Sequence, residues 1–297
     1  MKFDELKTVV VIGAGAMGRQ IAMNTVLNGR ARGYRVLLCD SFAPALESAE
    51  KWADGYLAGR VEKGRITKEE AEQVRQNLTI TSDVDGSAAQ ADFVIEAIVE
   101  DLKVKRELFA RISKICRPDA VLSTNSSNIV SSKLADVTEH PERLMNVHYF
   151  NPALAMKLVE LVRGAHTSDE TVAIAKAFAE STGKTAIVLN KEIAGFVVNR
   201  INAAVVHEAL SLLEQRIATV EDIDTACEKG LNYPMGPFRL MDLTGIDVNY
   251  YVRVDRYAES HDPYDAPHPL VVEKFKRGEY GKKTGKGWYE YPETAKQ

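Results

Sequence analysis

Short hydrophobic runs alternate with longer amphipathic stretches along the first 190 residues. The runs are rich in Val, Ile and Leu, as buried strands are, and cover residues 8–12, 35–39, 92–95, 120–123, 143–150, 156–162 and 185–189. Between them, apolar residues recur with the period of a helix at residues 16–28, 43–58, 101–115, 129–136 and 168–181. This alternation predicts βαβ units, with helices covering a parallel sheet.

After residue 190 the pattern becomes helical. Apolar residues keep the helical period at residues 193–215, 219–229, 237–244 and 246–259. The first of these stretches is apolar around much of its circumference, which indicates burial between domains or subunits. The tail, residues 278–291, is rich in Gly, Lys and aromatic residues and predicts a loop with a terminal strand. We therefore expect an α/β domain over residues 1–190 and an all-helical C-terminal domain over residues 191–297.

Composition excludes several classes of protein. Hydrophobic residues make up 45% of the 297 residues and charged ones 27%, which is typical of globular domains. The net charge of −4, without a long run of one sign, favours neither nucleic-acid binding nor a polybasic membrane anchor. A charged N-terminus and the lack of an apolar run of about 18 residues argue against a signal peptide and a spanning helix.

The three cysteines, Cys39, Cys116 and Cys227, are far apart and belong to no CxxC or Cys/His cluster. Neither a disulfide framework nor a metal site is expected from such spacing. A reducing compartment follows, and with it we expect a cytoplasmic location.

A glycine motif follows the first predicted strand. Gly13, Gly15 and Gly18 fit GxGxxG, directly before a predicted helix in which Ala16 and Met17 come first. Glycines at these places allow a tight turn, close approach of a pyrophosphate and close packing of helix on strand, and the helix N-terminus attracts phosphate. The context predicts a dinucleotide site, although a turn that merely packs tightly would use the same residues.

Asp40 ends the second predicted strand, where an acidic side chain can bind the adenosine ribose and favour NAD over NADP. Capping the next helix is its competing role. The interval from Gly13 to Asp40 is 27 residues, longer than the roughly 20 of the usual fingerprint. The extra residues, 28–35, carry arginines close in sequence to Asp40, so that NADP stays open as well.

His148 and Glu160 are candidates for acid/base chemistry. His148 lies near the end of a predicted strand, where α/β sheets bind ligands, and Glu160 lies inside the apolar run LVELV. Burying an unpaired carboxylate is costly, so we expect Glu160 to pair with His148 and orient its ring. A packed histidine and a glutamate on a water-facing edge strand are the alternatives.

Two further polar positions are candidates for ligand binding. Asn199 shares a helical stripe with Phe196 and Val206, and a buried amide needs a partner. Three partners are open: a substrate oxygen, the nicotinamide side of the cofactor, or a polar group on another helix. Residues 125–128, Asn-Ser-Ser-Asn, follow a strand and either reach the site or cap the next helix.

Eight motifs, spread over almost the whole chain, give a family resemblance. They are GAGAMG, AIVEDLKVKRELF, TNSSNI, HYFNP, MKLVELV, GFVVNR, YPMGPFRLMDLTGID and GKKTGKGWYEY. In this order they resemble the 3-hydroxyacyl-CoA dehydrogenase family, and in particular its short, free-standing bacterial 3-hydroxybutyryl-CoA dehydrogenases. The resemblance implies a Rossmann-like NAD-binding domain, a helical C-terminal domain that forms most of a homodimer interface, and NAD-dependent interconversion of L-3-hydroxyacyl-CoA and 3-oxoacyl-CoA.

The resemblance also implies residue roles. His148 becomes the general acid/base and Glu160 its orienting partner, while Ser127 and Asn199 bind the substrate. Ser127 is preferred to Ser126 because the spacing to the HYFNP motif is then free of gaps.

Cofactor and substrate contacts follow from the same motifs. Glu100, Lys105, Asn151 and Lys283 match family positions that contact NAD, as does Ser127. Lys63 matches a position that contacts the acyl-CoA, and it lies in a basic turn that could equally be a solvated loop.

The chain departs from the family pattern at three places. They are the long connection before Asp40, Asn128 in place of a second serine, and Ala194 before Gly195-Phe196. Two other functions stay open at this point. One is NAD-dependent oxidation of a secondary alcohol without CoA, of the L-gulonate or carnitine type. The other is a non-catalytic, crystallin-like NAD(H)-binding protein.

Overall fold

The computed structural model describes residues 1–292 and contains two compact units. The first is Met1–Phe196, and the second begins at Val197. No helix within the described residues is both long and apolar enough to cross a membrane.

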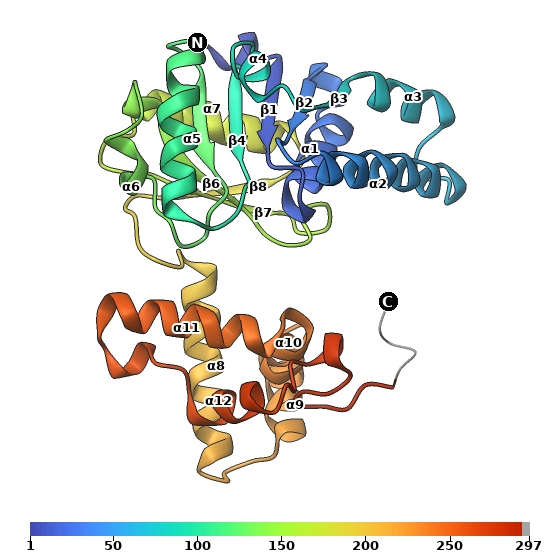
Figure 1. Cartoon of the computed structure of the whole chain (residues 1–297). Helices are drawn as coiled ribbons and strands as arrows, with labels where there is room; N and C mark the ends of the chain where they lie inside the picture. Colours follow the sequence, from blue (N-terminus) through green and yellow to red (C-terminus); the bar gives the residue numbers. More distant parts are fainter. Residues whose placement is uncertain (293–297) are drawn as a thin grey trace. The chain divides into compact units, whose positions relative to one another are not determined.

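The first unit is built around an eight-stranded sheet (Figure 1). Its strands are β1 Thr8–Ile12, β2 Arg35–Cys39, β3 Leu78–Thr81, β4 Phe93–Glu96, β5 Val121–Thr124, β6 Leu144–Tyr149, β7 Leu158–Val162 and β8 Thr185–Leu189. Their order is β3-β2-β1-β4-β5-β6-β7-β8, and every neighbouring pair is parallel except β6 and β7. The strand order reverses between β1 and β4, because β2 and β3 follow on one side of β1 and β4 to β8 follow on the other. Open α/β sheets bind ligands at such a point.

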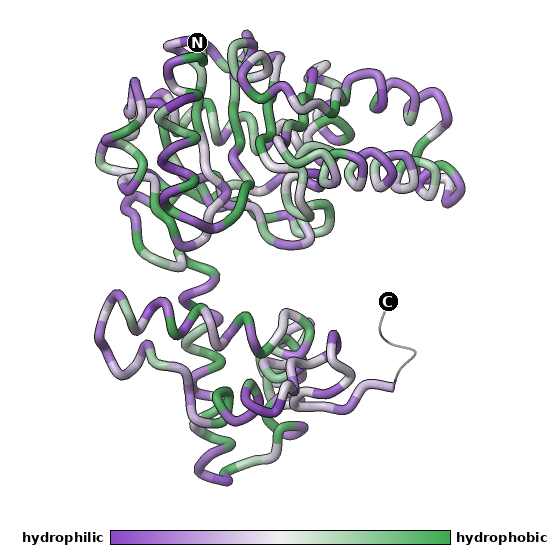
Figure 2. Tube along the Cα trace, viewed as in Figure 1, coloured by the Kyte–Doolittle hydropathy of each residue, from purple (hydrophilic) through white to green (hydrophobic). Residues whose placement is uncertain are grey.

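Helices cover both faces of this sheet. They are α1 Ala16–Asn28, α2 Ala43–Glu62, α3 Lys68–Gln76, α4 Val84–Ala88, α5 Leu102–Ile115, α6 Ser132–Ala135 and α7 Asp169–Ser181. Successive strand side chains point to opposite faces, so Val9 and Val11 of β1 pack with α1 and α7, whereas Val10 and Ile12 pack with α4 and α5. Figure 1 shows α2 and α3 side by side, and Figure 2 shows α3 as largely hydrophilic.

The second unit is helical. It consists of α8 Val198–Glu214, α9 Val220–Gly230, α10 Pro237–Thr244, α11 Ile246–Ser260 and α12 Pro269–Lys276. Its core includes Leu210 of α8, Phe238 and Met241 of α10, Ile246 of α11 and Val271 of α12. The predicted class, a Rossmann-like α/β domain followed by a helical domain, is confirmed.

Some local predictions were wrong. The sequence pattern missed β3 and α4, and the helix expected over residues 129–136 is only the four-residue α6. β7 runs antiparallel to β6, because the eight residues from 150 to 157 are too few for a crossover helix. The terminal strand is absent from the described part of the tail, where Lys286 makes only isolated bridges with Gly281 and Glu290.

Candidate active site

The loop between β1 and α1 needs glycine at two of its three motif positions. Gly13 has a φ of 110°, and a Cβ there would lie 2.5 Å from the carbonyl oxygen of Ala97. A Cβ on Gly18 would lie 1.7 Å from the carbonyl oxygen of Gly13. The loop therefore packs directly on the backbone that follows β4, and α1 packs directly on the loop.

The N-terminus of α1 is open. Its N-cap residue is Gly15, which has no side chain to bond the first N–H groups of the helix. A Cβ built on Gly15 would meet no atom within 4 Å. The first N–H groups of a helix have no intrahelical partner, and the helix dipole draws anions to them. The backbone at Ala16 and Met17 therefore fits a pyrophosphate.

Asp40 connects two backbone segments. Its Oδ2 accepts a hydrogen bond from the Ala14 N–H at 2.7 Å, and its Oδ1 accepts one from the Phe42 N–H at 2.9 Å. Since Phe42 is the N-cap residue of α2, Asp40 does not cap that helix, which was one of its two expected roles. Each oxygen keeps a further lone pair for a ribose hydroxyl.

The arginines of the long connection lie at the other end of β2. Arg30 and Arg32 precede the strand, and Asp40 follows it. Five strand residues at about 3.3 Å each separate the two ends by roughly 17 Å. Arg30 pairs with Glu70 at 2.9 Å and Arg32 with Asp4 at 3.1 Å. The doubt between NAD and NADP that rested on these arginines is thereby removed.

A cavity of about 710 Å³ lies beside the glycine loop. Gly13, Gly15 and Asp40 line it together with apolar side chains that include Val84 and Leu108. Ligand sites are commonly of this size and mostly apolar. The cavity, the carboxylate and the open helix end fit the adenosine and phosphates of a dinucleotide.

His148 and Glu160 face each other across β6 and β7. They are paired in the antiparallel ladder, and His148 Nδ1 lies 2.9 Å from Glu160 Oε2. Glu160 is fully buried and His148 is 6% exposed. β7 lies between β6 and β8, so the alternative of a water-facing edge strand is excluded. Such burial excludes the water that would weaken the attraction between the two groups.

The other ring nitrogen of His148 is free to react. The rings of Phe150 and Phe196 pack edge-on against the imidazole, with centroids 4.7 and 5.3 Å away. Within residues 1–292, Nε2 has no hydrogen-bond partner. A carboxylate on Nδ1 favours the tautomer with the proton on that nitrogen. Nε2 then carries a lone pair and can accept a proton.

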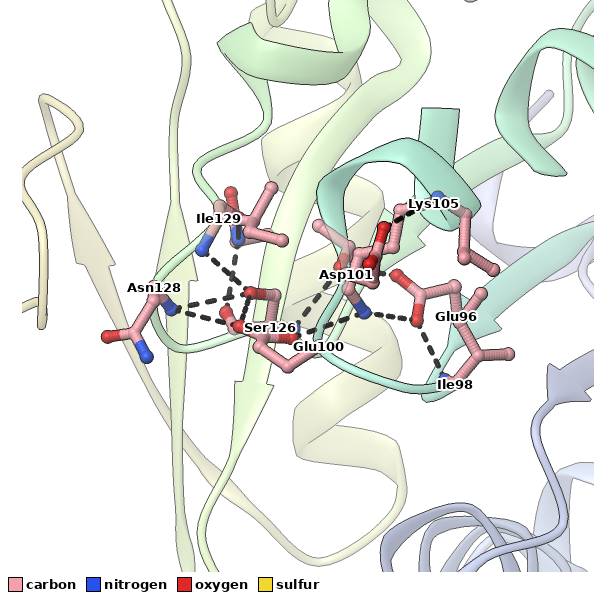
Figure 3. A network of polar contacts seen from close by, with 11 residues as sticks. Glu96, Ile98, Glu100, Asp101, Lys105, Ser126, Asn128 and Ile129 are labelled. Atoms are coloured by element: carbon pink, nitrogen blue, oxygen red, sulfur yellow. Dashed lines mark hydrogen bonds and ion pairs between the residues drawn. The ribbon is translucent and has the colours of Figure 1, made fainter. Parts of the chain in front are cut away.

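A buried network of charged groups connects the loops after β4 and β5 (Figure 3). Lys105 of α5 is 1% exposed, and its Nζ lies 2.6 Å from Glu96 and 3.3 Å from Glu100. Glu96 also accepts a hydrogen bond from Thr124 Oγ1 at 2.6 Å, and Glu100 accepts one from Ser126. The sequence predicted Glu100 and Lys105 as site residues but missed Glu96, although an acidic residue at the end of an apolar strand resembles the pattern that drew attention to Glu160.

Ser126 and Ser127 have different surroundings. Ser126 is 4% exposed, bonds to Glu100 and accepts the Ile129 N–H at 2.8 Å. Ser127 is half-buried, and no residue of the described chain bonds to its hydroxyl. Ser126 thus fixes the loop, while Ser127 can reach a ligand. In the same loop, Asn125 Oδ1 accepts the Tyr149 N–H at 2.8 Å, which joins the loop to the residue beside His148.

Two other predicted contacts of the first unit lie at its surface. Asn151 is exposed in the turn after β6. Lys63 is the C-cap residue that follows α2, and it lines a pocket of about 210 Å³ with two further basic side chains, Arg60 and Arg65, beside Tyr56. Three cations around one pocket favour an anionic ligand.

Asn199 and Lys283 belong to the second unit. Asn199 is half-buried in the first turn of α8. Phe196, expected on the same helical stripe, lies before the helix with a φ of 49°, which is why α8 begins at Val198 and not at residue 193. Lys283 Nζ lies 2.6 Å from the Asp247 carboxylate.

Comparison with known proteins gives two family matches that together span nearly the whole chain. Residues 8–193 match the 3-hydroxyacyl-CoA dehydrogenase NAD-binding domain, and residues 195–291 match the C-terminal domain of the same family.

Individual relatives agree with this. The chain is 36% identical to a probable 3-hydroxybutyryl-CoA dehydrogenase of Bacillus subtilis, covering 97% of this chain and 99% of the relative. It is 35% identical to the mitochondrial hydroxyacyl-coenzyme A dehydrogenase of Sus scrofa, covering 96% and 91%. The crystal structure of (S)-3-hydroxybutyryl-CoA dehydrogenase PaaH1 from Ralstonia eutropha is 33% identical, with a TM-score of 0.89 and coverage of 97% and 100%.

A complete family match, an open dinucleotide loop and a buried His/Glu pair thus agree with one another. The chain belongs to the 3-hydroxyacyl-CoA dehydrogenase family and is an NAD-dependent 3-hydroxyacyl-CoA dehydrogenase, an oxidoreductase of fatty acid metabolism.

Proposed function

We propose that this enzyme interconverts short-chain L-3-hydroxyacyl-CoA, 3-hydroxybutyryl-CoA above all, and the corresponding 3-oxoacyl-CoA, with His148 as the general acid/base. The observation that carries the catalytic assignment is the buried contact of 2.9 Å between His148 Nδ1 and Glu160 Oε2, with Nε2 left unbonded by the described residues. The short chain is supported by the names of relatives such as the one from Bacillus subtilis.

In the oxidising direction, His148 Nε2 takes the proton of the 3-hydroxyl group. Bound NAD supplies the acceptor for the hydride that leaves C3. Glu160 stabilises the imidazolium that forms and holds the ring in the reactive tautomer. The Ser127 hydroxyl and the Asn199 amide bind the substrate oxygens. In the reducing direction His148 returns the proton to the 3-oxygen.

The cofactor is held by groups along the carboxyl edge of the sheet. The backbone at Gly13, Gly15 and Ala16 to Gly18 binds the pyrophosphate, and Asp40 binds the adenosine ribose. Further contacts come from side chains of the loops after β4, β5 and β6 and from the C-terminal tail, namely Glu100, Lys105, Ser127, Asn151 and Lys283.

The CoA portion binds at Lys63. The pocket that Lys63 shares with Arg60 and Arg65 supports this, because CoA carries phosphates and the whole chain is net acidic. A local basic site is therefore needed to attract the substrate.

A homodimer is the proposed assembly. Large apolar side chains of the second unit are exposed in the single chain, among them Ile201 of α8 (59%) and Val248 and Tyr251 of α11 (48% and 56%). Exposed apolar side chains of this kind mark an interface. Light scattering should give twice the mass of the chain at micromolar concentration, and a monomer would contradict the proposal. The cytoplasmic location stays a prediction from composition.

The substrate is tested by NADH oxidation with 3-oxoacyl-CoA thioesters of increasing chain length, starting from acetoacetyl-CoA. We expect the highest kcat/KM for acetoacetyl-CoA. A higher value for long chains would refute the short-chain proposal, and faster oxidation of L-gulonate or carnitine would refute CoA specificity. Repeating the series with NADPH should give much lower rates.

A further inference from the structure

Glu96 is a buried carboxylate to which neither the family motifs nor the proposed mechanism gives a role. It is the last residue of β4, is fully buried, and accepts hydrogen bonds from Lys105 Nζ (2.6 Å), Thr124 Oγ1 (2.6 Å) and the Ile98 N–H (2.8 Å). Three donors on one carboxylate hold it in a fixed position. Glu96 therefore places a carboxylate at a fixed position inside the protein.

Two of these donors lie in or next to the loops that form the cofactor site, and the third, Lys105, belongs to α5. Ile98 lines the 710 Å³ cavity, and the backbone of Ala97 and Ile98 lies under Gly13. Thr124 ends β5 and precedes the loop with Ser127. Glu96 thus joins the loop beneath the phosphate-binding glycines to the loop that carries Ser127.

The network has an uncompensated charge. Glu96 and Glu100 contribute two negative charges, and Lys105 contributes one positive charge. The nearby Asp101 carboxylate accepts the Val104 N–H at 3.0 Å at the N-terminus of α5 and adds a further negative charge outside this group. One negative charge therefore remains among Glu96, Glu100 and Lys105; Glu96 and Lys105 are buried, whereas the Glu100 side chain is 41% exposed and its charge is screened more by salt.

The position of this charge in the sheet points to the nicotinamide half of the cofactor. Asp40, the proposed ligand of the adenosine ribose, lies at the end of β2. This strand is on one side of the point where the strand order reverses. β4 and β5 lie on the other side, between that point and β6, which carries His148. The ring that exchanges hydride with the substrate must lie toward His148, and so beyond β1 on the side of β4 and β5.

The nicotinamide ring carries a positive charge in NAD⁺ and none in NADH. A fixed negative charge near the ring attracts the oxidised form more than the reduced form. We propose that Glu96 is a positioning residue of the cofactor site, which orients Lys105 and the two loops and whose charge raises the affinity for NAD⁺ relative to NADH. The proposal rests on NAD binding and on the place that the proposed role of His148 gives the nicotinamide ring, but its test measures binding alone and needs no turnover.

The test compares dissociation constants for NAD⁺ and NADH in wild type and in Glu96→Gln. Glutamine has nearly the same shape and keeps an acceptor oxygen, but it removes the charge. NADH is titrated by its fluorescence and NAD⁺ by competition, without substrate. Contacts to ribose and phosphate are common to both forms, so the ratio of the two constants isolates the charge on the ring. We expect this ratio to shift against NAD⁺ by roughly three- to tenfold.

Thr124→Val is the matched control. It removes one hydrogen bond to Glu96 and keeps the charge, so both dissociation constants can rise while their ratio stays within about twofold of wild type. An unchanged ratio in Glu96→Gln would overturn the proposal, and so would an equal shift in Thr124→Val. If Glu96→Gln does not fold, Glu100→Gln decides, because it removes a charge from the same network at a position that is 41% exposed. A smaller shift against NAD⁺ would support the proposal, and an unchanged ratio would overturn it.

Discussion

Replacing Glu160 by glutamine separates the charge of the His148 partner from its shape. In the structure, His148 Nδ1 lies 2.9 Å from Glu160 Oε2. The glutamine amide keeps an oxygen that can accept the Nδ1 proton, and so preserves the reactive tautomer. It lacks the negative charge that stabilises the imidazolium formed as His148 takes the substrate proton. Hydrogen bonds to charged groups contribute about 1.5–3 kcal/mol. At about 1.4 kcal/mol per factor of ten, kcat should fall roughly ten- to a hundredfold.

The assay is NADH oxidation by acetoacetyl-CoA between pH 5.5 and 9, for wild type, Glu160→Gln and Glu160→Asp. We expect the pH profile of kcat to change in Glu160→Gln, because the imidazole has lost its charged partner, whereas Glu160→Asp keeps the charge and retains more activity. The dissociation constant of NADH should stay within about twofold of wild type, since the change is confined to the acid/base pair. A normal kcat with an unchanged pH profile in Glu160→Gln would refute the reasoning.

Three further predictions concern the cofactor, the substrate and the thiols. Asp40→Ala should weaken NADH binding by roughly tenfold and reduce the preference over NADPH, which titration with both cofactors would show; unchanged preference would exclude the ribose role. Lys63→Ala should raise the KM for acetoacetyl-CoA about fivefold without changing NADH affinity, and an unchanged KM would place CoA elsewhere. Burial raises the pKa of Cys39 to about 11 and of Cys116 to about 12, so at pH 8 both stay protonated and iodoacetamide should modify the more accessible Cys227 first. Peptide mapping that finds Cys39 or Cys116 modified first would contradict this.

The fold was largely predictable because its strands are buried on both faces and read as continuous hydrophobic runs. β3 escaped notice because it lies at the edge of the sheet, where Thr79 and Thr81 interrupt the apolar pattern and only Leu78 is buried. The direction of β7 depends on the length of the connection before it, a feature that hydrophobic periodicity does not encode.

Parts of the site were predictable for a similar reason. A carboxylate inside an apolar run needs a partner, and that requirement led from Glu160 to His148. The same reasoning would have selected Glu96, but its partner Lys105 lies in an ordinary amphipathic helix, and nothing local distinguishes that lysine from a surface residue.

Sequence distance was misleading at the connection before β2. Arg32 is only eight positions from Asp40, yet a strand lies between them and places the two at opposite ends of the sheet. The separate environments of Ser126 and Ser127 also depend on tertiary contacts, since Glu100, which binds Ser126, comes from another loop.

The most direct test of the account compares NADH oxidation by acetoacetyl-CoA in wild type and in His148→Gln, with the NADH dissociation constant measured for both. General acid/base groups contribute roughly a hundred- to ten-thousandfold to rates. We therefore predict that kcat falls by at least about a hundredfold in His148→Gln while NADH binds with nearly unchanged affinity. Near-normal turnover in this variant would contradict the assignment of His148, and with it the proposed mechanism.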